Sequence, residues 1–239
     1  MTVTRRSIEK DFRKLGDPAI AEHSKGFFKT GKGEYGEGDV FVGVRIPVIR
    51  AAVKNLREAS LTELEDILGS KYHEIRMLAL LCLVDHYHRG NEEKRKAIAA
   101  RYLASTAHIN NWDLVDCSAH KILGPHLENR SRKILYTFAR SKDLWKRRIA
   151  IMTTFHFIRF SGNKDFDDAL NIAQILLQDS EDLIHKAVGW MLREIGKQDK
   201  SVEDKFLIAH YKVMPRTMLR YAIEKYPEQE RQAFLKGEA

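Results

Sequence analysis

The clearest candidate for chemistry is the segment NNWDLVDCSAH, which spans residues 110–120. It is predicted to open a helix, and residues four apart share one face of a helix, so Trp112 and Asp116 would lie side by side. A large aromatic ring beside a carboxylate at the mouth of a helix is unusual for packing alone. Asp113, nearer the helix start, is expected to act as a cap or as a partner of the helix dipole. The segment is therefore either part of the core or one edge of a site.

Two later segments carry side chains that could complete such a site. Arg148 lies in LWKRRIAI and Trp190 lies in IHKAVGWMLRE. If the helices of these segments align with the first one, they present an acid, a cation and two aromatic rings along one surface. The alternatives are that Asp116 and Arg148 form a structural salt bridge, and that the tryptophans are partly buried core residues. Trp145 is assigned to the core.

Other catalytic and metal-binding patterns are weak. Asp113 and Asp116 are one turn apart on one predicted helix, unlike the facing carboxylates of glycoside hydrolases. Asp116 and His120 could supply half a metal site, but no third ligand accompanies them. His86 and His88 would face different ways on a helix. No nucleophile motif such as GxSxG occurs, so we expect neither a metal nor another cofactor.

A loosely repeated alanine predicts how the helices are arranged. The second helix of each predicted pair carries one such residue, at successive steps of 40, 31, 37 and 35: Ala79, Ala119, Ala150, Ala187 and Ala222. Alanine lets two helices approach closely, and an irregular period near forty is typical of HEAT-like helix pairs. We therefore predict an all-α fold over a single domain, residues 1–239. It would be a superhelical stack of antiparallel helix pairs with a concave basic surface. A compact all-α bundle is the alternative.

The N-terminal part of the chain predicts two short helices. Residues 4–15 form an amphipathic pattern with Ile8, Phe12 and Leu15 on one side. Asp17 is then expected as the N-cap and Pro18 as the first residue of a second helix, which would end near residue 24.

A glycine-rich loop is predicted over residues 24–46, because five glycines fall between residues 26 and 38. Lys25, Lys29 and Lys32 are interleaved there with aromatic residues. The loop is either a surface connection or a basic, aromatic flap that touches phosphates. Pro47 is expected to open the next helix, and all five prolines are expected at helix starts or in turns.

Composition favours an intracellular protein with a polyanionic partner. The 239-residue chain carries a formal charge of +8, with a pI of about 9.4. Residues 130–148 hold eight basic side chains against one acid, Asp143, which suits a phosphate backbone. Cys82 and Cys117 are 35 residues apart and form no CxxC motif, which favours a reducing compartment. We see neither a signal peptide nor a membrane-length apolar run, and we expect a cytoplasmic location.

The segments NNWDLVD, LWKRRIAI and IHKAVGWMLRE together resemble the signature segments of the AlkD-like DNA alkylation repair family. The resemblance extends from roughly Phe27 to Pro227. It implies a stack of HEAT-like repeats, in agreement with the alanine pattern. By motif, it implies that the active-site aspartate is Asp116, with Trp112 as its neighbouring tryptophan, Arg148 as the arginine and Trp190 as the second tryptophan.

The resemblance also implies an activity and a partner. Such proteins are monofunctional glycosylases that remove N3- and N7-alkylated purines from double-stranded DNA, without a base-binding pocket, in base excision repair. We expect a monomer that contacts DNA through Lys25, Lys29, Lys32, Lys146, Arg147, Lys186 and Arg193. Family members without glycosylase activity exist, so a non-catalytic HEAT-like module that binds branched or damaged DNA is one alternative. A protein-binding scaffold is another.

Overall fold

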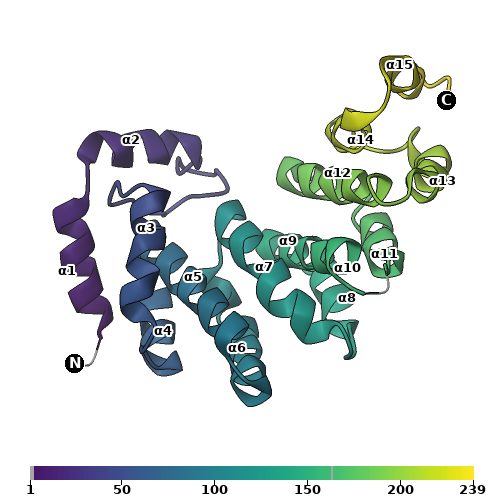
Figure 1. The fold of residues 1–239 in the computed structure, drawn as a ribbon. Helices are drawn as coiled ribbons and strands as arrows, with labels where there is room; N and C mark the ends of the chain where they lie inside the picture. The colour runs from purple at the N-terminus through teal and green to yellow at the C-terminus, as the bar shows by residue number, and fades with distance from the viewer. Residues whose placement is uncertain (1–2, 163) are drawn as a thin grey trace. The chain divides into compact units, whose positions relative to one another are not determined.

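The computed structural model describes residues 3–162 and 164–239, and every regular element in these residues is a helix (Figure 1). The predicted all-α fold is therefore confirmed. The chain divides into two compact units, an N-terminal unit that ends at Ser118 and a C-terminal unit that begins at Ala119. The continuous single domain stays a prediction. No helix in the described part of the chain is long and apolar enough to cross a bilayer.

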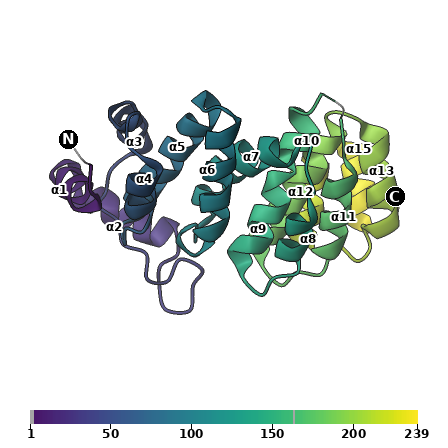
Figure 2. The ribbon, with the colours of Figure 1, turned by 90° about the horizontal axis from the view of Figure 1, so that it is seen from below.

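The N-terminal unit is centred on α5 (His73–Arg89). This helix is apolar on nearly all sides between residues 75 and 84, so it requires packing partners all around it. α3, α4 and α6 supply them, and α4, α5 and α6 lie side by side in Figure 2. The other helices of the unit are α1 (Arg5–Leu15), α2 (Pro18–Phe27), α3 (Ile46–Ala52), η1 (Val53–Leu56), α4 (Leu61–Leu68), α6 (Glu92–Ala104) and η2 (Thr106–His108). α7 (Trp112–Leu127) begins here and continues past Ser118.

The C-terminal unit is centred on α12 (Asp182–Gly196), which packs against α9, α13 and α14. α12 and α14 touch closely at Gly189, where an added Cβ would lie 2.4 Å from the Met218 carbonyl oxygen. Only glycine permits that approach. The other helices are α8 (Lys133–Ala139), α9 (Leu144–Thr153), α10 (Phe155–Arg159), α11 (Asp167–Ile175), α13 (Lys200–His210), α14 (Arg216–Ala222), η3 (Ile223–Lys225) and α15 (Glu228–Lys236).

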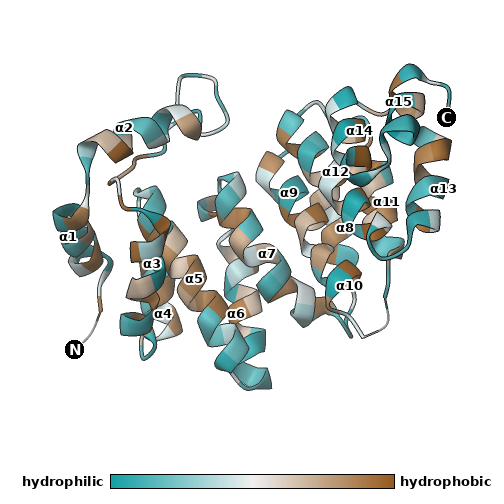
Figure 3. Cartoon of the chain, turned by 45° about the horizontal axis from the view of Figure 1, so that its top comes forward, coloured by the Kyte–Doolittle hydropathy of each residue, from teal (hydrophilic) through white to brown (hydrophobic). Residues whose placement is uncertain are grey.

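The repeated alanines lie on the second helix of each predicted pair and are buried there, as expected for close helix contacts. They fall on α5, α7, α9, α12 and α14, and all five are fully buried: Ala79, Ala119, Ala150, Ala187 and Ala222. The predicted pairs α4 with α5, α8 with α9 and α11 with α12 pack together, whereas α14 packs chiefly on α12 rather than on α13. Figure 3 shows helices in which apolar and polar residues alternate along the ribbon, as expected for elements with one face on the core.

Helix boundaries near the N-terminus follow the local capping chemistry. α1 begins after Thr4, whose hydroxyl accepts a hydrogen bond from the backbone N–H of Ser7 in a capping box. α2 begins after Asp17, which accepts from the backbone N–H of Ala19 at 2.8 Å. The start of α2 at Asp17 and Pro18 was expected from the sequence, and α1 begins one residue later than the predicted residue 4.

Four local expectations were wrong. α2 continues to Phe27 instead of ending near residue 24, because the Phe28 N–H still bonds the Ser24 carbonyl oxygen at 2.9 Å. The loop therefore begins at residue 28 rather than at residue 24, and α3 begins at Ile46 rather than Pro47. Leu15 is 59% exposed although Phe12 on the same helix side is buried, because Leu15 is the last residue of α1. Pro125 lies inside α7, in its last turn, where few ladder bonds remain to be lost.

Candidate active site

The first turn of α7 is held by its own polar side chains. Asn111 is fully buried, and its Oδ1 accepts a hydrogen bond from the Trp112 backbone N–H at 2.8 Å. Asp113 Oδ1 accepts from the backbone N–H of Leu114, also at 2.8 Å, which agrees with the expected role in satisfying helix-terminal N–H groups. Trp112 and Asp116 follow one turn apart on the same helix, and both are half-buried. The prediction that Trp112 and Asp116 lie on one helix is confirmed.

The Trp112 ring rests on aromatic side chains from the end of α2. It stacks on Phe28 with ring centroids 5.5 Å apart and an angle of 25° between the planes. Phe27 meets it edge-on at 5.9 Å and is itself 58% exposed. Phe28 also stacks on Phe41, at 5.2 Å. The aromatic residues of the glycine-rich segment therefore support Trp112 from one side, an arrangement that positions the ring at the surface rather than in the core.

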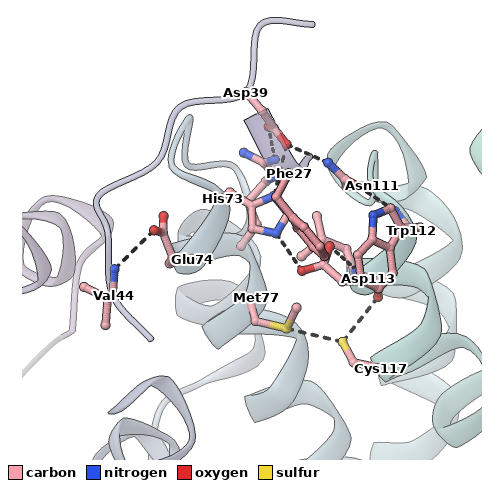
Figure 4. A network of polar contacts seen from close by, with 12 residues as sticks. Phe27, Asp39, Val44, His73, Glu74, Met77, Asn111, Trp112, Asp113 and Cys117 are labelled. Atoms are coloured by element: carbon pink, nitrogen blue, oxygen red, sulfur yellow. Dashed lines mark hydrogen bonds and ion pairs between the residues drawn. The ribbon is translucent and has the colours of Figure 1, made fainter. Parts of the chain in front are cut away.

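A buried charged network lies behind this aromatic cluster (Figure 4). The imidazole of His73, 3% exposed, has Nδ1 3.0 Å from an Asp39 oxygen and Nε2 2.8 Å from an Asp113 oxygen. Arg76 pairs with the other Asp39 oxygen, and Asn111 Nδ2 donates to Asp39 at 3.2 Å. The network thereby connects α5, the loop after α2 and the start of α7.

His73 and Asp39 stabilise each other's charged forms. Burial alone would lower the pKa of His73, but the Asp113 and Asp39 carboxylates outweigh it and raise that pKa to about 9. Burial alone would raise the pKa of Asp39, but the hydrogen bond from His73 and the charge of Arg76 lower it. The His73 imidazole is therefore charged at neutral pH and is paired with two carboxylates.

The loop that carries Asp39 is anchored next to the network by Glu74. This carboxylate is 4% exposed and accepts hydrogen bonds from three successive backbone N–H groups, those of Val42, Gly43 and Val44, at 2.7–3.3 Å. The His73 backbone N–H in turn bonds the Val40 carbonyl oxygen at 2.9 Å. The second half of the glycine-rich loop is consequently fixed to the N-terminal end of α5.

In the C-terminal unit, Trp190 is oriented by Glu194 one turn further along α12. The indole Nε1–H donates to Glu194 at 3.2 Å, and the Trp190 ring packs against Phe155 at 5.8 Å. Glu194 is 5% exposed and also pairs with Lys197 at 2.5 Å. Trp190 itself is half-buried. Its ring is thus held by a hydrogen bond to Glu194 and by a contact with the Phe155 ring.

Arg148 is a buried arginine of α9. Its side chain is 5% exposed, and Nη1 donates to the Leu183 carbonyl oxygen at 2.5 Å.

A family model for DNA alkylation repair enzymes matches residues 8–226, most of the chain. The chain belongs to the DNA alkylation repair enzyme family. A solved structure described as a predicted DNA alkylation repair enzyme from Enterococcus faecalis has the same fold, with a TM-score of 0.69 at 20% identity. The match covers 89% of this chain and 97% of that one. No curated protein matches the chain.

The four site residues expected in this family are divided between the two units. Trp112 and Asp116 lie in the N-terminal unit, and Arg148 and Trp190 lie in the C-terminal unit. Their roles, and the row that would bring them together, stay predictions. Among residues 3–162 and 164–239, no three histidine, cysteine, aspartate or glutamate side chains lie close enough to hold a metal ion.

Several of the expected DNA-contacting side chains have acidic partners. The ion pairs are Lys25 with Glu22, Lys186 with Asp182, Arg147 with Asp179 and Arg193 with Glu224. Lys146 lies over the Phe138 ring at 5.9 Å, whereas Lys29 and Lys32 are exposed. The exposed pairs are weak enough for a phosphate to displace, but the Arg147 pair is two-pronged and only 13% of that side chain is exposed. All seven DNA contacts stay predictions.

In the fold, acidic side chains from elsewhere in the chain pair with two of the basic residues in segment 130–148. Arg132 pairs with Asp165 and Asp168 at 2.5 and 2.6 Å and lies over the Phe157 ring at 3.8 Å. Arg147 pairs with Asp179. The acids come from residues 32–36 positions further along the chain, so a local count of charge misses them.

The sequence reasoning missed the buried network around His73. A signal was present in HEIRMLALLCLV, where three ionisable residues open a helix that is otherwise apolar. Ionisable side chains are rarely buried unless they are paired, so His73, Glu74 and Arg76 required partners of opposite charge or backbone donors. The sequence did not indicate which residues those partners are.

Proposed function

We propose that this member of the DNA alkylation repair family is a monofunctional DNA glycosylase. Its substrates would be cationic N3- and N7-alkylpurines in duplex DNA. The observation that carries the proposal is the first turn and a half of α7, where a half-buried carboxylate, Asp116, follows a supported, half-buried ring, Trp112. Family membership over residues 8–226 supports alkylated DNA as the substrate.

The positive charge of the lesion explains why cleavage of its glycosidic bond needs few catalytic groups. An N3- or N7-alkylpurine carries a positive charge, and breaking its bond to C1′ of deoxyribose returns the bonding electron pair to the purine and makes it neutral. No strong general acid is then required for the leaving group. The positive charge moves to the sugar as an oxocarbenium ion, and a water oxygen forms the new bond to C1′.

In this proposal Asp116 stabilises the charge that develops on the sugar. A carboxylate near C1′ gains more interaction energy with the oxocarbenium ion than with the intact nucleotide, which is the condition for lowering a barrier. The same carboxylate orients the water and accepts its proton, which then passes to solvent.

Trp112 and Trp190 would act through their ring faces. An aromatic face attracts a cationic centre, and each such contact contributes about 0.5–2 kcal/mol. Phe28 holds the first ring and Glu194 holds the second, so neither ring needs to be ordered when DNA binds. By the family motif, Arg148 would hold a phosphate through its guanidinium.

The proposed mechanism selects lesions by their lability rather than by base contacts. A neutral damaged base is a poor leaving group and would need an acid that the proposal does not supply. We therefore expect efficient release of 3-methyladenine and 7-methylguanine and little release of neutral lesions.

The test is base release from methylated duplex DNA, measured by mass spectrometry beside DNA affinity. Asp116→Asn and Trp112→Ala are expected to lose base release and to retain DNA binding. Glu58→Gln, which removes an exposed carboxylate from the same unit, serves as the matched control. DNA binding without base release by the wild-type protein would instead identify a non-catalytic binding module.

A further inference from the structure

Asp39 is the point at which three parts of the N-terminal unit meet. Its side chain is 3% exposed, and it takes hydrogen bonds from Arg76 on one oxygen and from His73 and Asn111 on the other. Arg76 and His73 belong to α5, Asn111 immediately precedes α7, and Asp39 itself lies at the end of the glycine-rich turns. One buried carboxylate therefore ties the loop, α5 and the start of α7 together.

His73 extends this connection to the first turn of α7. Both of its ring nitrogens face carboxylate oxygens, at 3.0 Å for Asp39 and 2.8 Å for Asp113. An ionised carboxylate only accepts hydrogen bonds, and a neutral imidazole has a single N–H to donate. The two contacts are satisfied together only when the ring carries a proton on each nitrogen.

The same imidazole also belongs to the aromatic cluster beneath Trp112. Its centroid lies 4.8 Å from those of Phe28 and Phe41, and Phe28 stacks on Trp112. Asp113, which His73 holds through Nε2, is the residue after Trp112 and lies three positions before Asp116. The ring therefore contacts the support of Trp112 and the helical turn that carries Asp116.

We propose that His73 is a positioning residue for base excision, because its doubly protonated ring joins Asp39 to Asp113 and so fixes the turn of α7 that carries Trp112 and Asp116. This inference rests on the proposed glycosylase function. It assigns His73 no contact with DNA, since the side chain is 3% exposed.

The charged groups around the ring determine how pH acts on it. Asp39 faces it from the loop and Asp113 from α7, while Arg76 on its own helix reaches it only through Asp39. Glu74, also on α5, is occupied by the backbone N–H groups of residues 42–44. Because the two carboxylates raise the pKa of His73 to about 9, positioning is expected to persist at neutral pH and to weaken as pH rises through that value.

Two conservative substitutions separate the two contacts. The amide nitrogen of asparagine occupies about the place of imidazole Nδ1, and that of glutamine about the place of Nε2. His73→Asn therefore keeps a donor for Asp39 and removes the one for Asp113, and His73→Gln does the reverse. His88→Asn, at an exposed position of the same helix, is the control.

The first readout is single-turnover release of 3-methyladenine, corrected for release without protein, together with DNA affinity. His73→Asn is expected to slow release about tenfold or more, since small displacements of catalytic groups have effects of that order. His73→Gln is expected to slow it less, and DNA affinity is expected to stay within about twofold for both. The wild-type rate should fall as pH rises through about 9, whereas the rate of His73→Gln should show no such fall. Equal rates and pH profiles in all variants would overturn the inference.

The second readout does not depend on activity. With Trp145 and Trp190 replaced by phenylalanine, Trp112 is the sole source of tryptophan fluorescence. We expect acrylamide to quench it more strongly in His73→Asn than in His73→Gln or His88→Asn. If the wild-type protein releases no base but this difference is observed, the glycosylase proposal fails and the positioning of Trp112 by His73 stands. Identical quenching in the three variants would overturn the positioning role itself.

Discussion

Replacing His73 with glutamine is expected to remove a pH-dependent contribution to stability. The pKa of His73 rises from 6.5 to about 9 in the folded protein, and one pKa unit corresponds to about 1.4 kcal/mol. The native state thus gains about 3 kcal/mol from protonation of this ring.

The sign of the effect follows from which state holds the proton. The raised pKa means that the folded protein binds a proton that the unfolded chain releases above pH 6.5, so stability falls with rising pH between 6.5 and about 9. Below that window the contribution is fully present, and above it the contribution is lost. The glutamine variant, which has no proton to lose, lacks this slope.

Urea unfolding followed by circular dichroism measures the effect. The difference in unfolding free energy between wild type and His73→Gln is expected to shrink by about 3 kcal/mol between about pH 6 and about pH 10. Other groups that titrate in this range affect both proteins and cancel in the difference. A difference that stays constant with pH would refute the charged bridge between Asp39 and Asp113.

Three further predictions concern packing and anchoring. Gly189→Ala is expected to destabilise the protein by about 1–3 kcal/mol, because the new Cβ would lie 2.4 Å from the Met218 carbonyl oxygen. At Gly26 in α2 an added Cβ meets nothing within 4 Å, so Gly26→Ala is expected to leave the thermal midpoint unchanged or to raise it, since alanine is the better helix former. Glu74→Gln is expected to lower the free energy of unfolding by about 1–2 kcal/mol, because it weakens the acceptor of three backbone N–H groups. The same change is expected to speed proteolysis within residues 28–38. Unchanged proteolysis would contradict the anchoring role. Burial raises the pKa of the Cys82 thiol to about 12. In a Cys117→Ser variant, a thiol reagent is therefore expected to label Cys82 only after unfolding. Rapid labelling of the native protein would argue against the burial of Cys82.

The features that the sequence predicted are those set by local chemistry. The spacing of Ala79, Ala119, Ala150, Ala187 and Ala222 predicts positions where helices approach closely, and all five are buried. Asp17 and Pro18 predicted a helix start because capping depends on residues within one turn. Trp112 and Asp116 share a helix for the same local reason.

The features that it missed depend on contacts between distant residues. His73 meets Asp39 and Asp113, which are 34 residues before it and 40 after it. The partners of Arg132 and Arg147 are likewise 32–36 residues away. Helical periodicity cannot reveal such pairs, because it describes which face a side chain occupies and not what the neighbouring element brings to that face.

Base release from methylated duplex DNA, compared between wild type and Asp116→Asn, tests the central claim most directly. The account predicts that mass spectrometry detects free 3-methyladenine and 7-methylguanine with the wild-type protein alone, while both proteins bind the DNA. If neither protein releases a base although both bind DNA, the chain is a binding module, and the catalytic role proposed for Asp116 is wrong.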